Sequence, residues 1–110
     1  PVPLTKKKYK DRGFNQSELI SKYCFDFSKK IKVDLLHKIK NTKDQKQLES
    51  EERSRNLVNA FELSNKEIIQ GKRILIVDDV ITTGSTIKTV AELLVKSGCK
   101  EVNVFSLFKV

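Results

Sequence analysis

Apolar residues recur at the spacing of an α-helix in two parts of the chain. Residues 15–30 predict a helix whose buried stripe consists of Leu19, Ile20, Tyr23, Cys24, Phe27 and Ile31. Asn15 would cap this helix, with Glu18 as its partner in a capping box. The second pattern predicts a helix that ends at Gly98 and buries Ile87, Val90, Ala91, Leu94 and Val95.

Four short segments have the apolar content of β-strands, at residues 33–39, 60–63, 73–77 and 101–110. The last of them carries apolar residues on both alternating sides, which predicts a strand that is covered on two faces. Residues 1–4 indicate the end of a further strand, because two prolines do not fit a central ladder.

Three polar segments connect these elements and show no long apolar period. Residues 5–12 are a basic run that is broken by Gly13, and we predict a loop there. Residues 41–49 also predict a loop, followed by a short helix that Ser50 would cap. Residues 65–70 predict a helical turn that ends at Gly71.

The alternation of strands and helices predicts one α/β domain over residues 1–110. We expect a parallel, Rossmann-like sheet with right-handed crossovers and helices on both faces. A chain of 110 residues is near the lower size limit for such an architecture. Because the chain begins at Pro1 without a Met, we also expect it to be truncated at the N-terminus.

The positive charge of the chain is concentrated in its first part. The net charge is +8, and all of this excess lies within residues 1–46. Such asymmetry favours a polyanion or a polyphosphate ligand facing that part of the chain. A solvated, lysine-rich surface explains the same asymmetry equally well.

The remaining composition predicts a cytoplasmic protein without membrane insertion, since no signal peptide and no apolar run of transmembrane length is present. Cys24 and Cys99 lie far apart without metal-ligand spacing. We therefore expect reduced, buried or half-buried thiols and no zinc site within this chain. His37 is the only histidine, and the sequence assigns it no role.

Residues 74–86 combine four apolar residues, two acids, two more apolar residues and a hydroxyl-rich turn. Ligands of open α/β sheets bind at the carboxyl ends of strands, where this turn is expected. Backbone amides at the start of the following helix, with Gly84 and the hydroxyls, suit a phosphate. Asp78 and Asp79 suit sugar hydroxyls or a hard divalent cation. The plain alternative is a strand, a turn and a capped helix with two solvated acids.

This stretch closely resembles the phosphoribosyl pyrophosphate (PRPP) motif of type I phosphoribosyltransferases, and every position agrees with that pattern. The resemblance implies the type I phosphoribosyltransferase fold. It implies that Asp78 and Asp79 hold the ribose hydroxyls and serve Mg²⁺ as indirect ligands. The 5′-phosphate would be held by Thr82, Thr83, Gly84, Ser85 and Thr86. Enzymes that act on 6-oxopurines usually carry an acid in place of Thr82, so purine salvage is disfavoured.

Three further stretches resemble the ComF/GntX-like family, whose members include competence proteins of the ComFC type. They are Pro1-Val2-Pro3-Leu4, then Arg12-Gly13-Phe14-Asn15-Gln16, and then Thr42-x-x-Gln45-x-x-Leu48 with Arg53-x-x-Asn56 and Ala60-Phe61. This resemblance implies a role in natural competence and DNA uptake. Two departures stand out: the family's zinc ribbon is not present within this chain, and Asn59 occupies a position that is commonly glycine.

The same resemblance suggests residues for pyrophosphate and for catalysis. The pyrophosphate candidates are Pro3, Leu4, Arg12, Asn15 and Gln45, and the catalytic candidates are Asp78, Asp79, Lys43 and Arg53. Plain alternatives are a solvated loop for Lys43, a pairing of Arg53 with Glu49, and a helix cap for Asn15. The implied reaction is displacement of pyrophosphate by a nitrogen nucleophile of unknown identity. Non-catalytic proteins also use the PRPP motif, so the sequence predicts binding and leaves turnover open.

The alternative function is single-stranded DNA binding by the basic N-terminal run, with PRPP as a regulator rather than a substrate. The residues concerned are Lys6, Lys7, Lys8, Tyr9, Lys10 and Arg12. A third hypothesis is a PRPP sensor that binds a protein partner. The partners considered are thus PRPP, single-stranded DNA, other DNA-uptake proteins and a second copy of the chain in a homodimer.

Overall fold

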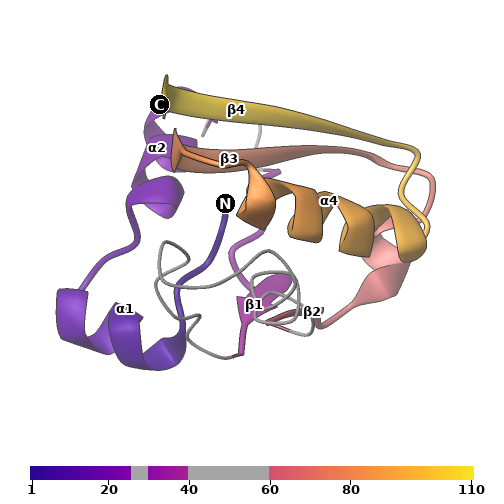
Figure 1. Cartoon of the computed structure of the whole chain (residues 1–110). Helices are drawn as coiled ribbons and strands as arrows, with labels where there is room; N and C mark the ends of the chain where they lie inside the picture. Colours follow the sequence, from indigo (N-terminus) through magenta and orange to yellow (C-terminus); the bar gives the residue numbers. More distant parts are fainter. Residues whose placement is uncertain (26–29, 40–59) are drawn as a thin grey trace, which may run out of the picture.

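Two parallel strands and the helix that joins them carry the motif. The computed structural model describes residues 1–25, 30–39 and 60–110. Strands β3 (Arg73–Ile81) and β4 (Glu101–Lys109) run parallel, and helix α4 (Ser85–Lys96) connects them along the lower side of the pair in Figure 1. The register places Val77 opposite Phe105.

The hydrophobic core lies between α4 and this strand pair. Val90 and Leu94 are one helical turn apart on α4, and both are buried in one cluster with Ile76 of β3. The cluster also contains Val2, Ala60, Phe61, Leu63 and Ile69. Full burial of one of the larger apolar side chains contributes roughly 1.5–3 kcal/mol to the stability of the fold. The predicted stripe of this helix is confirmed except for Val95, which is exposed.

Helix α2 (Gln16–Phe25) reaches the opposite face of the strands. Side chains alternate along a strand, so Val77 and its partner Phe105 face away from the side of Ile76. There the rings of Phe25 and Phe105 meet edge to face, with centroids 5.3 Å apart. Helices therefore contact both faces of a parallel strand pair, and the predicted α/β fold class is confirmed.

The predicted buried stripe of α2 is wrong. Leu19, Tyr23 and Cys24 are exposed, whereas Ser17 and Ser21 are buried. The small serines let the helix lie close to β3, which large apolar side chains on the same face would prevent. Their hydroxyls keep hydrogen-bond partners, so burying them leaves no unsatisfied donor. Phe27 lies outside the described residues, and Cys99 is half-buried as expected.

The strand predicted at residues 33–39 is shorter than expected and does not join the parallel pair. Strand β1 (Leu36–Lys38) runs antiparallel to β2 (Phe61–Leu63) in a separate sheet. Phe61 and Leu63 are buried members of the hydrophobic core, while Glu62 between them is exposed. The predicted helical turn after it is present as the 3-10 helix η3 (Lys66–Ile69), which precedes Gly71 at a positive φ of 66°.

The basic N-terminal run is a helix rather than the predicted loop. Helix α1 (Lys6–Arg12) begins after Thr5, whose hydroxyl accepts a hydrogen bond from the amide of Lys8 at 3.2 Å. It ends at Gly13, whose φ of 84° is a left-handed conformation that glycine adopts without strain. Lysine and arginine are good helix formers, so a capped polar segment can be helical without an apolar stripe.

Strand β4 is less covered than predicted. Val104, Leu107 and Phe108 are exposed, and among the described residues the strand pairs only with β3. Alternation of apolar residues therefore did not indicate burial on both faces. Across the same described ranges, no helix has both the length and the apolar character needed to span a membrane.

Candidate functional site

The predicted acids lie at the carboxyl end of β3, next to the start of α2. Asp78 and Asp79 are both half-buried and belong to the last four residues of the strand. One carboxylate oxygen of Asp78 accepts a hydrogen bond from the hydroxyl of Ser17 at 3.1 Å and another from the amide of Asp79 at 3.0 Å. The hydroxyl of Ser106 on β4 lies 3.2 Å from the carbonyl oxygen of Asp79. Hydrogen bonds from α2 and from β4 thus hold the carboxylate of Asp78 and the main chain at Asp79.

Burial raises the pKa of Asp78 to about 6, and the side chain of Asp79 adds to this effect. The hydrogen bonds from the Asp79 amide and the Ser17 hydroxyl act in the opposite direction, because they stabilise the charged form. The carboxyl of Asp78 therefore takes up its proton at a higher pH than an exposed aspartate does. A cation or a hydrogen-bond donor from a ligand would favour its ionised form.

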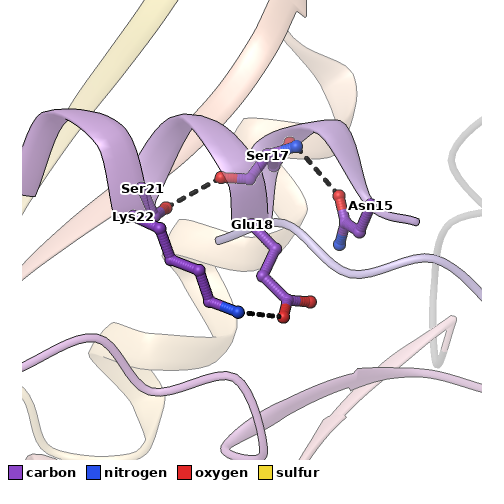
Figure 2. A network of polar contacts seen from close by, with 5 residues as sticks. All are labelled: Asn15, Ser17, Glu18, Ser21 and Lys22. Atoms are coloured by element: carbon purple, nitrogen blue, oxygen red, sulfur yellow. Dashed lines mark hydrogen bonds and ion pairs between the residues drawn. The ribbon is translucent and has the colours of Figure 1, made fainter. Parts of the chain in front are cut away.

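A closed ring of hydrogen bonds connects α2, the N-terminal segment and β3. The amide of Val2 donates to the carbonyl of Val77 at 2.9 Å, and the side-chain amide of Asn15 donates to the carbonyl of Val2 at 3.0 Å. The side-chain oxygen of Asn15 accepts from the amide of Ser17 at 2.9 Å (Figure 2). Since Ser17 then reaches Asp78, the first turn of α2 sets the position of the acid.

Asn15 is accordingly a buried helix cap, as one of the predicted alternatives had it. Glu18, the expected capping-box partner of Asn15, instead forms an ion pair with Lys22 through its carboxylate at 3.1 Å (Figure 2). Figure 2 also shows the hydroxyl of Ser21 directed at Ser17, whose carbonyl oxygen accepts its hydrogen bond at 2.8 Å. At Ser17 and Ser21, the face of α2 toward β3 therefore carries small polar side chains, and each hydroxyl has a hydrogen-bond partner.

The turn after β3 has the conformation that an anion site needs. Gly84 precedes α4, a helix of 12 residues, with a φ of 82°. The hydroxyl of Thr83 accepts from the amide of Ser85 at 3.3 Å and lies 2.9 Å from the Ser85 hydroxyl. Thr82 and Thr83 are exposed, whereas Ser85 and Thr86 are half-buried. Backbone amides, hydroxyls and the helix dipole therefore converge on one open turn, which suits a phosphate.

The two acids fit a hard divalent cation of the Mg²⁺ type. Mg²⁺ prefers carboxylate oxygens and commonly completes its shell with water and with phosphate oxygens of a substrate. Within the described ranges, no three His, Cys, Asp or Glu side chains form a group that could hold a metal ion by themselves. Asp78 and Asp79 would therefore hold such a cation together with a ligand, not as a closed protein site.

The other predicted site residues have diverse positions. Pro3, Leu4 and Asn15 line a cavity on the side of α1 and β1. Arg12 is exposed at the end of α1, where its guanidinium donates to the side chain of Gln16 at 3.1 Å. Lys43, Gln45 and Arg53 lie outside the described residues.

Two residues near the acids escaped the sequence analysis. Ser17 donates a hydrogen bond to Asp78. The negative charge of Asp78 raises the pKa of Lys38 on β1, against the larger lowering effect of burial. Ser17 and Ser21 have a signal in hindsight, because two small polar residues spaced by four mark a helix face that can approach a strand closely. Lys38 has none, since it is one lysine among many in the first part of the chain.

Comparison with known proteins gives a consistent result. The family description "Phosphoribosyl transferase domain" matches residues 10–110. The chain is 37% identical to "Competence protein F" of Haemophilus influenzae over 97% of its own length and 48% of that protein. It is 38% identical to "DNA utilization protein YhgH" of Escherichia coli, with coverage of 96% and 46%. It is 36% identical to "Competence protein ComFC" of Streptococcus pneumoniae, with coverage of 98% and 46%.

The chain thus spans about half the length of these curated relatives. No solved structure matches it significantly.

Proposed function

Because the chain belongs to the phosphoribosyltransferase domain family, and to its ComF-like members, we propose that it binds PRPP with Mg²⁺ at residues 74–86. One observation carries this proposal. The acid pair at the end of β3 is followed directly by Gly84 and the open start of α4. Donors for a phosphate and acceptors for sugar hydroxyls are therefore adjacent in a single turn of chain.

Each part of the turn would have its own role. The amides at the start of α4, with the hydroxyls of Thr83 and Ser85, would bind the 5′-phosphate. Asp78 and Asp79 would accept hydrogen bonds from the two ribose hydroxyls. Bound Mg²⁺ would supply positive charge to the pyrophosphate oxygens. The ring of hydrogen bonds through Ser17 keeps the carboxylate of Asp78 in place before the ligand arrives, which lowers the ordering cost of binding.

The reaction class that suits this ligand is transfer of the phosphoribosyl group to a nitrogen acceptor. A carbon–nitrogen bond would form at the anomeric carbon as the bond to the pyrophosphate oxygen breaks. The electron pair leaves with pyrophosphate, and the acceptor nitrogen loses its proton to water. A pyrophosphate-release assay with PRPP, Mg²⁺ and a panel of nitrogenous acceptors tests for turnover separately from binding.

The names of the relatives suggest where such a protein works. "Competence protein" and "DNA utilization protein" describe those proteins, and we extend this context to the present chain as a role in natural DNA uptake.

A second candidate function is single-stranded DNA binding by α1, which the exposure of Lys6, Lys7, Lys8, Lys10 and Arg12 favours. The ring of Tyr9, 44% exposed on the same helix, could stack on a base. Binding of an oligothymidylate should weaken steeply between low and physiological salt, and a flat salt dependence would exclude this contact.

Calorimetric titration of the chain with PRPP and Mg²⁺ tests the main proposal. Asp78→Asn/Asp79→Asn should weaken binding about tenfold or more, because hydrogen bonds to charged groups contribute about 1.5–3 kcal/mol each. Glu92→Gln is the matched control, since Glu92 is an exposed acid farther along α4. Equal affinity of the wild type and the double variant would refute the assignment of the site.

A further inference from the structure

Strand β4 forms an outer edge of the β3–β4 pair (Figure 1). Among the described residues this nine-residue strand pairs only with β3. The carbonyl of Val77 is directed away from β4, to the amide of Val2, and backbone groups alternate in direction along a strand. In the observed register, the amides and carbonyls of Val102 and Val104 therefore face outward. An edge of this kind is a template for a further strand.

The apolar side chains near this edge are exposed. The exposed fraction is 41% for Val104, 50% for Leu107 and 65% for Phe108. Between Glu101 and Lys109 the strand carries neither a charged residue nor a proline. Natural proteins commonly guard an edge strand with charges or prolines, or cover it with a helix or a loop. Within the described ranges, residues 102–108 have none of these guards on the outer edge, which therefore suits a partner strand.

The two charges at the ends of β4 are complementary to those of a second copy. Glu101 begins the strand and Lys109 ends it. Antiparallel pairing of two copies about Phe105 brings each Glu101 opposite Lys109 of the other copy, whereas parallel pairing in register would place like charges together. The same antiparallel register sets Val102 opposite Phe108 of the second copy, which joins a β-branched to an aromatic side chain.

We propose that β4 is a self-association surface, on which a second copy of this chain adds its own β4 antiparallel and centred on Phe105. The two copies then form one sheet in which neither β4 is an edge. The arrangement is two-fold symmetric, so each copy offers and receives the same surface. This inference is independent of the proposed function, because the acids and the turn at Gly84 belong to β3 and its connection to α4.

Sedimentation velocity over a series of protein concentrations measures the association. The wild type should change from monomer to dimer as its concentration rises. Val104→Lys should weaken the dimer at least about tenfold, because it brings two desolvated positive charges close to the symmetry axis. Ile68→Lys is the matched control, since Ile68 on η3 is 42% exposed and Val104 is 41% exposed. This control should associate as the wild type does.

Exchange of the terminal charges tests their complementarity. Glu101→Lys and Lys109→Glu should each weaken the dimer about five- to tenfold, because each places like charges opposite one another at both ends of the ladder. The double variant Glu101→Lys/Lys109→Glu should restore the wild-type affinity. Such a rescue also shows that the single variants are folded.

Crosslinking tests the register. In this ladder Asn103 lies opposite Leu107 of the second copy in a non-hydrogen-bonded pair, whose Cα atoms are about 4.5 Å apart. This separation suits a disulfide. In a Cys24→Ser/Cys99→Ser background, oxidised Asn103→Cys/Leu107→Cys should therefore migrate as a covalent dimer on a non-reducing gel. Each single variant should migrate as a monomer, because the two copies of one thiol lie about 13 Å or more apart along the ladder.

Four outcomes would overturn the proposal. A monomer at every concentration measured excludes self-association. A dimer that Val104→Lys leaves intact has its interface elsewhere. Crosslinking of either single variant, or none in the double variant, contradicts the register. Slow hydrogen exchange of the Val102 and Val104 amides in the monomer would show that another segment of the same chain covers the edge.

Discussion

Asp78→Asn should stabilise the free protein at neutral pH even though it removes a residue of the proposed site. Burial raises the pKa of Asp78 from 3.8 to about 6, so ionisation at neutral pH opposes the folded state. A shift of about two units corresponds to roughly 3 kcal/mol without solvent screening. The carboxyl is only half-buried, and we therefore expect about 1–2 kcal/mol after allowing for screening.

The substitution is conservative for hydrogen bonding. The side-chain oxygen of Asn can still accept from the hydroxyl of Ser17 and from the amide of Asp79, which both bond to one oxygen of Asp78. The substitution removes the charge of Asp78 together with its desolvation cost and its repulsion by Asp79. The gain in stability at pH 7.5 should raise the melting temperature by about 5–10 °C for a domain of this size.

The pH dependence has a definite sign. A carboxyl whose pKa is raised in the folded state binds its proton more tightly there than in the unfolded chain. Its favourable contribution is complete below about pH 4 and is lost as the pH rises through about 6. The advantage of Asp78→Asn should accordingly vanish near pH 4 and reach its full size above pH 7.

Urea denaturation at several pH values, in the presence of EDTA and without PRPP, measures this difference. Glu92→Gln, which neutralises an exposed acid of α4, is the control and should show no such trend. The reasoning is refuted if Asp78→Asn is less stable than the wild type at pH 7.5. A stability difference that is constant from pH 4 to 7.5 would equally contradict it.

Three other substitutions test the supporting structure. Ser17→Ala should lower PRPP affinity about tenfold in calorimetry, because it removes the hydroxyl that bonds to Asp78; unchanged affinity would show that this bond does not position the acid. Gly84→Ala meets open space but forces a side chain into a positive φ, which should cost about 1–2 kcal/mol in thermal unfolding; no loss of stability would contradict that conformation. Val90→Ala should destabilise the fold by about 2 kcal/mol in urea, since Val90 is fully buried; a change near zero would contradict its place in the core.

The predictions that succeeded concern features made by neighbouring residues. The strand, the acid pair, the glycine turn and the helix of residues 73–96 follow one another without interruption. The apolar stripe of α4 and the turn at Gly84 follow short-range rules of periodicity and backbone sterics. The same holds for the helical turn before Gly71.

Two of the predictions that failed concern which face an element buries. On α2 the apolar residues suggested one face, whereas the structure buries the face of Ser17 and Ser21. On β4 two apolar sides suggested cover on both faces, and Phe108 is exposed instead. Burial depends on what packs against an element, and a single segment does not contain that information.

Residues 74–86 show the difference between what neighbouring residues predict and what tertiary packing adds. By itself the sequence determined the order of acids, turn and helix, because covalent neighbours fix it. Only the folded chain shows that Ser17 holds Asp78 across 61 positions of sequence. This contact forms because α2 packs beside β3, and the burial of Asp78 in the folded chain raises its pKa.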